Sequence, residues 1–401
     1  MRSEEMTPDY KPILRRIDVI PGEYQGKPVI FLRDPVGFVD EAIAFPQNIL
    51  IFLSLMDGEH DLRDLQAEAM KRFGELIPLE EIIQLVKFLD EKGYLWSENF
   101  EKIKERAYEK WFNQRLRLMA HAGICYPLEK ESAKAFIDSI LNLSSANSSE
   151  VPKILIVPHL DLRSGAKAYA EGYRRFKVPS GGRVIILGVG HHLDYPYSLL
   201  TKDIATPFGI LRNDRGGLLY LANAKKIELF PDHIAHKLEH SIEFQALFLG
   251  GLKGEEIVVL PFLIGSHMVL FSNKSLVESL ALALAELIDE KTFIVLGIDF
   301  CHKGLRYGDP FPVEEPLVRE ILDIDKTMID LAFKGESSAL EHFILQKEEM
   351  KICGAGPLYL LSLILQKLTL SGKGEIFYQE VVPFGEGSAV SVASAGFFSK
   401  T

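Results

Sequence analysis

Uncharged apolar runs recur in the second half of the chain, and their pattern predicts buried strands. Each run is short and rich in β-branched residues, which is typical of a parallel strand covered on both faces. Between the first two runs, residues 164–176 have a spacing compatible with a helix, so the unit is strand, crossover helix, strand. The four main runs are residues 154–157, 184–189, 257–264 and 293–298.

Helical patterns continue this alternation, and two strands close it. The sequence therefore predicts an α/β fold with a mostly parallel sheet of about six strands, covered by helices on both faces. The later helices are expected at residues 272–289, 316–333, 338–346 and 358–367, and the closing strands at 375–383 and 389–398.

The first hundred residues follow a different pattern. Residues 10–34 alternate apolar pairs with glycine and proline, which indicates a β-hairpin. Three segments with apolar residues three and four positions apart then predict short helices, and residues 93–96 are interpreted as a β-wing. We expect a small winged-helix-like α+β module at residues 1–100, a helical connector at 101–118 and the α/β domain at 119–401. The three helices are expected at 48–56, 62–73 and 79–92.

Charge and length limit the classes of partner. The chain has 401 residues, with 45 Lys and Arg against 56 Asp and Glu, a net charge of -11, and no basic stripe for nucleic acid. The middle helix of the module carries Asp61, Asp64 and Glu68, so a protein or peptide is the expected partner. No apolar run has the length of a membrane span, and the first residues lack a signal-peptide pattern, so we expect a cytoplasmic protein.

Histidines gather where the predicted strands end. Eight of the eleven lie between His159 and His302. His159 follows the first strand, His191 the second, and Asp299 and His302 the fourth. Open α/β sheets place ligands at the carboxyl ends of their strands, where these residues are expected to meet. A further polar group, which includes Glu239 and His240, precedes an apolar helix.

These residue types permit a metal site. Neutral imidazoles with a thiolate or carboxylate form three-ligand sites with open positions, as in catalytic zinc or non-haem Fe(II) centres. Glu239 and Asp299 would then orient ligand imidazoles. The alternative for any single histidine is a core residue satisfied by the backbone. The three cysteines are too scattered for a disulfide framework or a CxxC zinc site, and His121, His267 and His342 are interpreted as structural.

Several blocks of this sequence resemble, in order and spacing, the signature blocks of the Memo family. The match begins near Arg115 and reaches the C-terminus, and with the N-terminal module the chain is similar to the microbial group called AmmeMemoRadiSam system protein B. One departure is Leu160-Asp161-Leu162, where the family commonly has Ala-Gly-Tyr. The matching blocks are Ala120-His-Ala-Gly123, Pro158-His159, Leu187-Gly-Val-Gly-His-His192, Glu239-His-Ser-Ile-Glu243, Asp299-Phe-Cys-His302 and Ile352-Cys-Gly354.

This resemblance implies a fold similar to the catalytic subunit of class III extradiol dioxygenases. It implies metal binding by His159, His191 and Cys353, with His240, Asp299 and His302 in the same pocket. Fe(II) is the expected metal, with copper and zinc as alternatives. An AMMECR-type protein and a radical SAM enzyme are the implied partners, and the N-terminal module looks like PqqD-type winged helices that hold peptides.

The leading hypothesis is a metal-dependent redox enzyme that acts with a radical SAM partner on a small molecule or a peptide. In this hypothesis His240 or His302 serves as the acid/base, and Asp299 or Glu239 fixes an imidazole. We expect His159 and His191 to leave neighbouring strands. A helix N-terminus and the cation are expected to lower the pKa of the Cys353 thiol. The alternatives are a non-catalytic metal- or peptide-binding adaptor and a zinc hydrolase with the same pocket.

Overall fold

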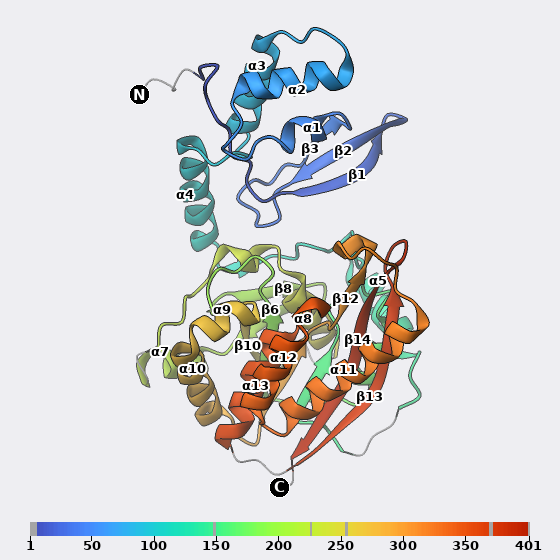
Figure 1. Ribbon diagram of the computed structural model, residues 1–401. Helices are drawn as coiled ribbons and strands as arrows, with labels where there is room; N and C mark the ends of the chain where they lie inside the picture. The colour runs from blue at the N-terminus through green and yellow to red at the C-terminus, as the bar shows by residue number, and fades with distance from the viewer. Residues whose placement is uncertain (1–5, 147–149, 225–226, 253–255, 369–371, 400–401) are drawn as a thin grey trace. The chain divides into compact units, whose positions relative to one another are not determined.

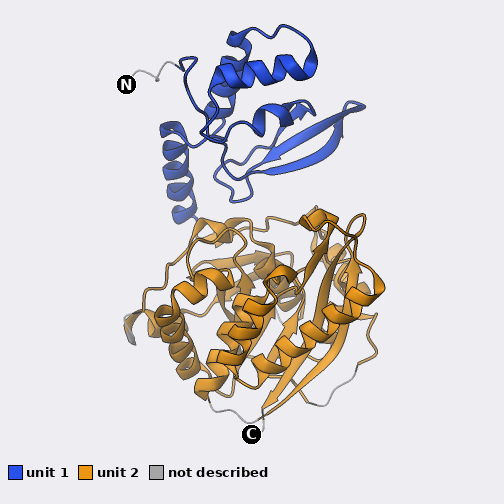
Figure 2. Ribbon diagram, viewed as in Figure 1, with its two compact units in different colours: residues 1–114 blue, residues 115–401 orange. Residues whose placement is uncertain are grey.

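The computed structural model describes residues 6–146, 150–224, 227–252, 256–368 and 372–399. It divides the chain into two compact units, Met1–Gln114 and Arg115–Thr401, which Figure 2 colours separately. Within the described ranges, no helix combines the length and the apolar composition that crossing a bilayer requires.

Unit 1 begins with a small antiparallel sheet. Strands β1 (Asp18–Tyr24), β2 (Lys27–Arg33) and β3 (Ile43–Pro46) pair in that order. The predicted hairpin is β1–β2, and its two turn residues, Gln25 and Gly26, both have positive φ, as a tight hairpin turn requires. The expected wing at 93–96 is wrong, because only Leu95 pairs there, in an isolated bridge to Leu14. The predicted helices are α1 (Ile49–Leu53), α2 (Leu62–Phe73) and α3 (Leu79–Glu91).

Helix α4 (Glu98–Asn113) packs as part of unit 1, although the sequence assigned 101–118 to a connector. Arg15 explains this packing. Its guanidinium lies 3.6 Å from the ring centroid of Phe100 on α4 and pairs with buried Asp34 at 3.3 Å. The contact ties the helix to the N-terminal sheet region.

Unit 2 holds an 11-stranded sheet, and its central strands are parallel, so the predicted α/β class is confirmed (Figure 1). The path runs β12-β14-β5-β11-β6-β10-β9-β8-β4, with β13 beside β14 and β7 beside β10. The sheet is larger than predicted because β4, β7, β8, β9 and β12 are only 2 to 5 residues long, too short to leave a recognisable apolar run in the sequence. The strands are β4 (Leu116–Arg117), β5 (Ile154–Val157), β6 (Arg183–Val189), β7 (Tyr197–Leu199), β8 (Asp203–Thr206), β9 (Gly209–Asn213), β10 (Val258–Ile264), β11 (Thr292–Gly297), β12 (His302–Gly304), β13 (Gly372–Pro383) and β14 (Ser388–Ser399).

Helices cover both faces of this sheet (Figure 1). On one face lie α6 (Ala166–Tyr173) and α8 (His240–Leu252), with α5 (Lys130–Leu141) packed on them. The other face carries the rest, which explains why β5 and β11 are buried throughout. These remaining helices are α7 (Arg215–Ala224), α9 (His267–Ser272), α10 (Lys274–Leu287), α11 (Glu315–Phe333), α12 (Ser337–Gln346) and α13 (Ala355–Leu368).

Strand order corrects one expectation about the site. Strands β5 and β6, which lead to His159 and His191, are not neighbours, because β11 lies between them. Register nevertheless aligns their ends: Gly297 of β11 is paired with Val157 on one side and Gly188 on the other. All three strands therefore end at one edge of the sheet.

Candidate metal centre

Three imidazoles from distant parts of unit 2 meet at this edge. His159 follows β5, His191 follows β6, and His240 is the first residue of α8. The centroids of their rings are 5.0, 5.0 and 5.1 Å apart, and one nitrogen of each ring lies within 4.8 Å of those of the others. His159 is buried, while the other two rings are partly exposed.

Two glycines explain how a helix start comes so close to the strand ends. A Cβ at Gly188 of β6 would lie 2.6 Å from Ser241 Oγ, and a Cβ at Gly297 of β11 would lie 2.4 Å from Ser241 O. Any side chain at these positions would push the first turn of α8 away from the sheet. The glycines at the ends of the two apolar runs therefore permit His240 to join the other imidazoles.

Each of the three rings has its Nδ1 engaged by an acceptor. His159 Nδ1 donates to Gly297 O at 2.9 Å. The Glu239 carboxylate accepts from His191 Nδ1 at 3.0 Å and pairs with His240 Nδ1 at 3.2 Å. In this arrangement Nε2 is the nitrogen that each ring presents as a ligand, with its tautomer fixed from behind. The predicted role of Glu239 as an orienting group agrees with this geometry.

The charge states suit a cation. Burial, together with His240 and His191 nearby, holds the pKa of His159 well below its usual value, so that ring is neutral at neutral pH. Burial alone would raise the pKa of Glu239, but the two imidazoles outweigh it and the pKa lies well below its usual range. A neutral ligand backed by an ionised carboxylate is the state that metal binding requires.

Cys353 lies beside His159, between the short helix Glu348–Met350 and α13. Its Sγ is 3.5 Å from His159 Nε2 and 3.3 Å from Asp299 O. A tetrahedral centre with metal–nitrogen and metal–sulfur bonds of about 2.0 and 2.3 Å separates the two donor atoms by roughly 3.5 Å. The distance between Sγ and His159 Nε2 agrees with this value, but Cys353 is not part of the group whose ligand atoms all lie within 4.8 Å of one another, which His159, His191 and His240 form.

The low pKa expected of this thiol rested on a helix N-terminus together with a bound cation, and the residues of the chain by themselves shift its pKa the other way. Burial and the nearby Asp299 raise the pKa of Cys353 well above its ordinary value, although α13 begins two residues later. Desolvation disfavours the charged thiolate in this buried place. A thiolate at this position therefore depends on a bound cation.

The structure also places Asp299 and His302 at this edge. Asp299 is buried, accepts from the backbone N–H of His159 at 2.9 Å, and lies 3.5 Å from His159 Nε2. Burial raises its pKa. His302 Nδ1 donates to Phe300 O at 3.0 Å, its ring packs on Tyr307, and burial lowers its pKa.

His121, interpreted from the sequence as structural, also lies in this region. Its ring centroid is 5.9 Å from that of His240, and its Nδ1 lies 3.2 Å from Glu243 Oε2. Apart from the family-like block around it, no spacing in the sequence marks this residue. His342, by contrast, contacts Gln346 on its own helix, as expected for a structural residue.

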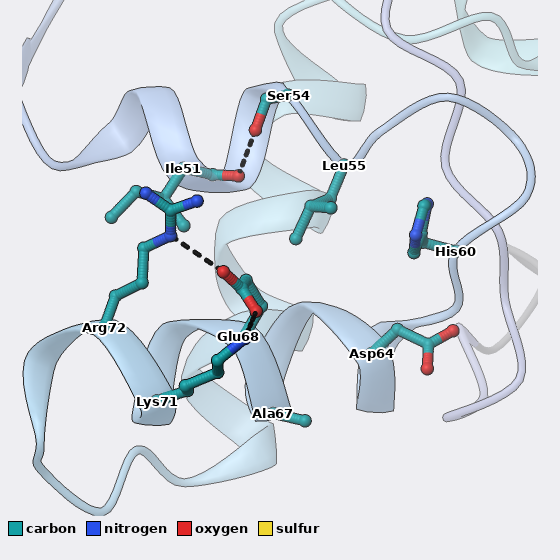
Figure 3. Close-up of a pocket in the computed structure, with 9 residues that line it drawn as sticks. All are labelled: Ile51, Ser54, Leu55, His60, Asp64, Ala67, Glu68, Lys71 and Arg72. Carbon is teal, nitrogen blue, oxygen red and sulfur yellow. Dashed lines mark hydrogen bonds and ion pairs between the residues drawn. The ribbon is translucent and has the colours of Figure 1, made fainter.

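Unit 1 contains a cavity of about 340 Å³ between α1 and α2, and its lining includes none of the three converging histidines. Figure 3 shows Leu55 pointing into it, with Glu68 on the opposite wall bonded to Arg72. The cavity combines an apolar wall with charges of both signs. Its lining residues are Ile51, Ser54, Leu55, His60, Asp64, Ala67, Glu68, Lys71 and Arg72.

Comparison with known proteins matches residues 117–395 to a family model described as Memo-like protein, so the match begins just after unit 1 ends. A MEMO1 family protein of Aquifex aeolicus is 37% identical over 317 residues, 78% of this chain and 82% of that protein. A MEMO1 family protein of Thermus thermophilus is 31% identical, over 72% and 85% of the two chains. Protein MEMO1 of Rattus norvegicus is 26% identical, over 65% and 88%.

Proposed function

The chain belongs to the Memo family, and we propose that its second unit is a metal-dependent oxidoreductase with non-haem Fe(II) as cofactor. One observation carries this proposal. His159, His191 and His240 converge with their Nδ1 atoms engaged elsewhere, and the Cys353 thiol lies 3.5 Å from His159 Nε2, close enough to join the centre by a small movement.

The donor set narrows the choice of metal. Imidazole suits zinc, copper and iron, and a thiolate disfavours magnesium and calcium. Iron is favoured by the resemblance to class III extradiol dioxygenases, since Fe(II) accepts further ligands beside those of the protein. Zinc with the same donors would support hydrolysis instead.

When bound, such a metal would supply Lewis acidity and redox chemistry. The residues of the chain then orient its ligands and handle protons. Glu239 holds the rings of His191 and His240, and buried Asp299, whose pKa is raised, retains a proton more readily than an exposed carboxyl. We assign proton transfer to His302, which is partly exposed and held at Nδ1 by the backbone.

Metal analysis of protein purified without oxygen tests this function. Iron bound in proportion to protein, and lost in His159→Ala, is the expected result. Zinc as the bound metal would favour the hydrolase, and protein that binds none of iron, copper or zinc would leave the adaptor as the better proposal. Substitution of exposed His342, which contacts Gln346 of its own helix, provides a histidine control.

The cavity of unit 1 favours a second role, docking of a peptide or of a partner such as the suspected radical SAM enzyme or AMMECR-type protein. Its apolar wall and mixed charges suit an extended peptide better than a nucleic-acid backbone. Ala67 lies exposed in its lining, so Ala67→Trp should fill the cavity without disturbing the core. Lys87→Trp, on the exposed surface of α3, is the matched control.

Pull-down of the partner by the full chain measures this second role. We expect Ala67→Trp to lose the partner and Lys87→Trp to keep it. Equal capture by both variants would place docking elsewhere, and salt-sensitive retention on duplex DNA would contradict the peptide assignment.

A further inference from the structure

A buried ion pair lies directly behind the turn that carries Glu239 and His240. Arg117 of β4 binds Glu243 of α8, and the two side chains are only 1% and 2% exposed. Strand β4 itself pairs with β8, which fixes Arg117 at the start of unit 2.

The guanidinium of Arg117 uses its other donors on backbone carbonyls. Nη2 donates to Glu239 O at 2.8 Å, and Nε donates to His236 O at 3.0 Å. These two carbonyls lie on either side of the turn from the short helix Ile234–Lys237 into α8. The planar fork of arginine therefore holds the backbone on which His240 sits.

The carboxylate of Glu243 gathers the segment that follows β4. It accepts from the backbone N–H groups of Ala120 at 3.0 Å and His121 at 2.8 Å, and from Tyr126 Oη at 2.6 Å. Burial alone would raise its pKa, but Arg117 and His121 outweigh burial and the pKa lies well below its usual value. The Glu243 carboxylate is therefore ionised, and both of its oxygens accept hydrogen bonds.

We propose that Arg117 and Glu243 are positioning residues of the metal centre, which rests on the function proposed above. Through Glu239 O they set the place of the Glu239 carboxylate, which in turn holds His191 and His240. Two of the three imidazoles thereby depend on a pair that touches no ligand atom. Loss of such outer support weakens metal binding by about 10- to 100-fold.

The test removes both charges together, because a single neutral substitution would leave the other charge buried and unpaired. The variant is Arg117→Met with Glu243→Met in the full chain. The matched control is Arg183→Met with Asp214→Met, another largely buried ion pair, in which Arg183 also donates to Leu287 O. Arg183 starts β6 at the end opposite to His191.

Co(II) is the probe, and its visible absorption reports the ligand geometry of the bound ion. We expect the Arg117/Glu243 double variant to bind Co(II) about 10- to 100-fold more weakly with an altered spectrum. The Arg183/Asp214 variant should keep both properties, whatever its melting temperature. Arg117→Lys keeps the positive charge but loses the planar guanidinium, and it should show the same spectral change. This variant replaces the double variant in the test if the double variant does not fold.

The positioning role would be overturned if the Arg117/Glu243 variant kept the Co(II) affinity and spectrum of the wild type. If the double variant is unfolded, the same result in Arg117→Lys would overturn it. A wild-type protein that binds no Co(II) would instead overturn the metal centre. The two failures are therefore distinguishable.

Discussion

Glu239→Gln is the sharpest test of how the three imidazoles are held. The carboxylate of Glu239 is 5% exposed and serves both His191 and His240, with a further bond from Ser241 N at 3.0 Å. Glutamine preserves the length of the side chain but offers only one acceptor oxygen. Its amide N–H₂ must then face the Nδ1–H of one of the two rings.

The magnitude follows from these contacts. A hydrogen bond to a charged group contributes about 1.5–3 kcal/mol, and the substitution removes one such bond and weakens the other. Loss of about 1.5–3 kcal/mol in ligand orientation corresponds to roughly 10- to 100-fold weaker metal binding, which is also the usual effect of removing an outer carboxylate. Folding should change little, because glutamine still bonds to Ser241 N.

Anaerobic titration with Fe(II) and Zn(II) against a competing chelator measures the affinity. Glu286→Gln, at an exposed carboxylate on α10 that accepts from Tyr220, is the control and should bind like wild type. Wild-type affinity in Glu239→Gln would refute the idea that this carboxylate fixes the ligands.

Four further outcomes are expected. Cys353→Ser should weaken metal binding and abolish the thiolate-to-Co(II) charge-transfer absorption, whereas full retention of both would remove the thiolate from the centre. The sequence analysis gave His240 an acid/base role outside the ligand set, but the geometry predicts clear loss of metal in His240→Ala, and measured metal content decides. Arg15→Met leaves the partner carboxylate buried and unpaired, so urea unfolding should show unit 1 weakened by about 3–5 kcal/mol with metal content unchanged. Asp325→Asn should stabilise the protein above neutral pH, because burial raises the pKa of this carboxyl from 3.8 to about 7. Between these two pKa values the native state binds more protons than the unfolded state, so the stability of the wild-type protein falls as pH rises through this range. Urea titrations at several pH values should find this slope absent in the variant.

The strands of the central sheet were predictable because burial on both faces excludes charge from them. Strands β5, β6, β10 and β11 each match an apolar run of the sequence within one or two residues. The exits of β5, β6 and β11 were equally visible, since Asp299 directly follows its run and a single residue separates His159 and His191 from theirs. What the pattern does not contain is the order of strands, because β11 inserts between β5 and β6 through contacts that local periodicity does not record.

The position of His240 shows where sequence reasoning ends and packing begins. His240 follows no strand, so the rule that linked His159 and His191 to one edge gave it no place among the ligands. Its ring arrives there because Gly188 and Gly297 leave room for the first turn of α8. The glycines, the adjacent Glu239 and the histidine are each ordinary in sequence. Only their contact in space makes one carboxylate serve two imidazoles, and that contact is what the Glu239 substitution measures.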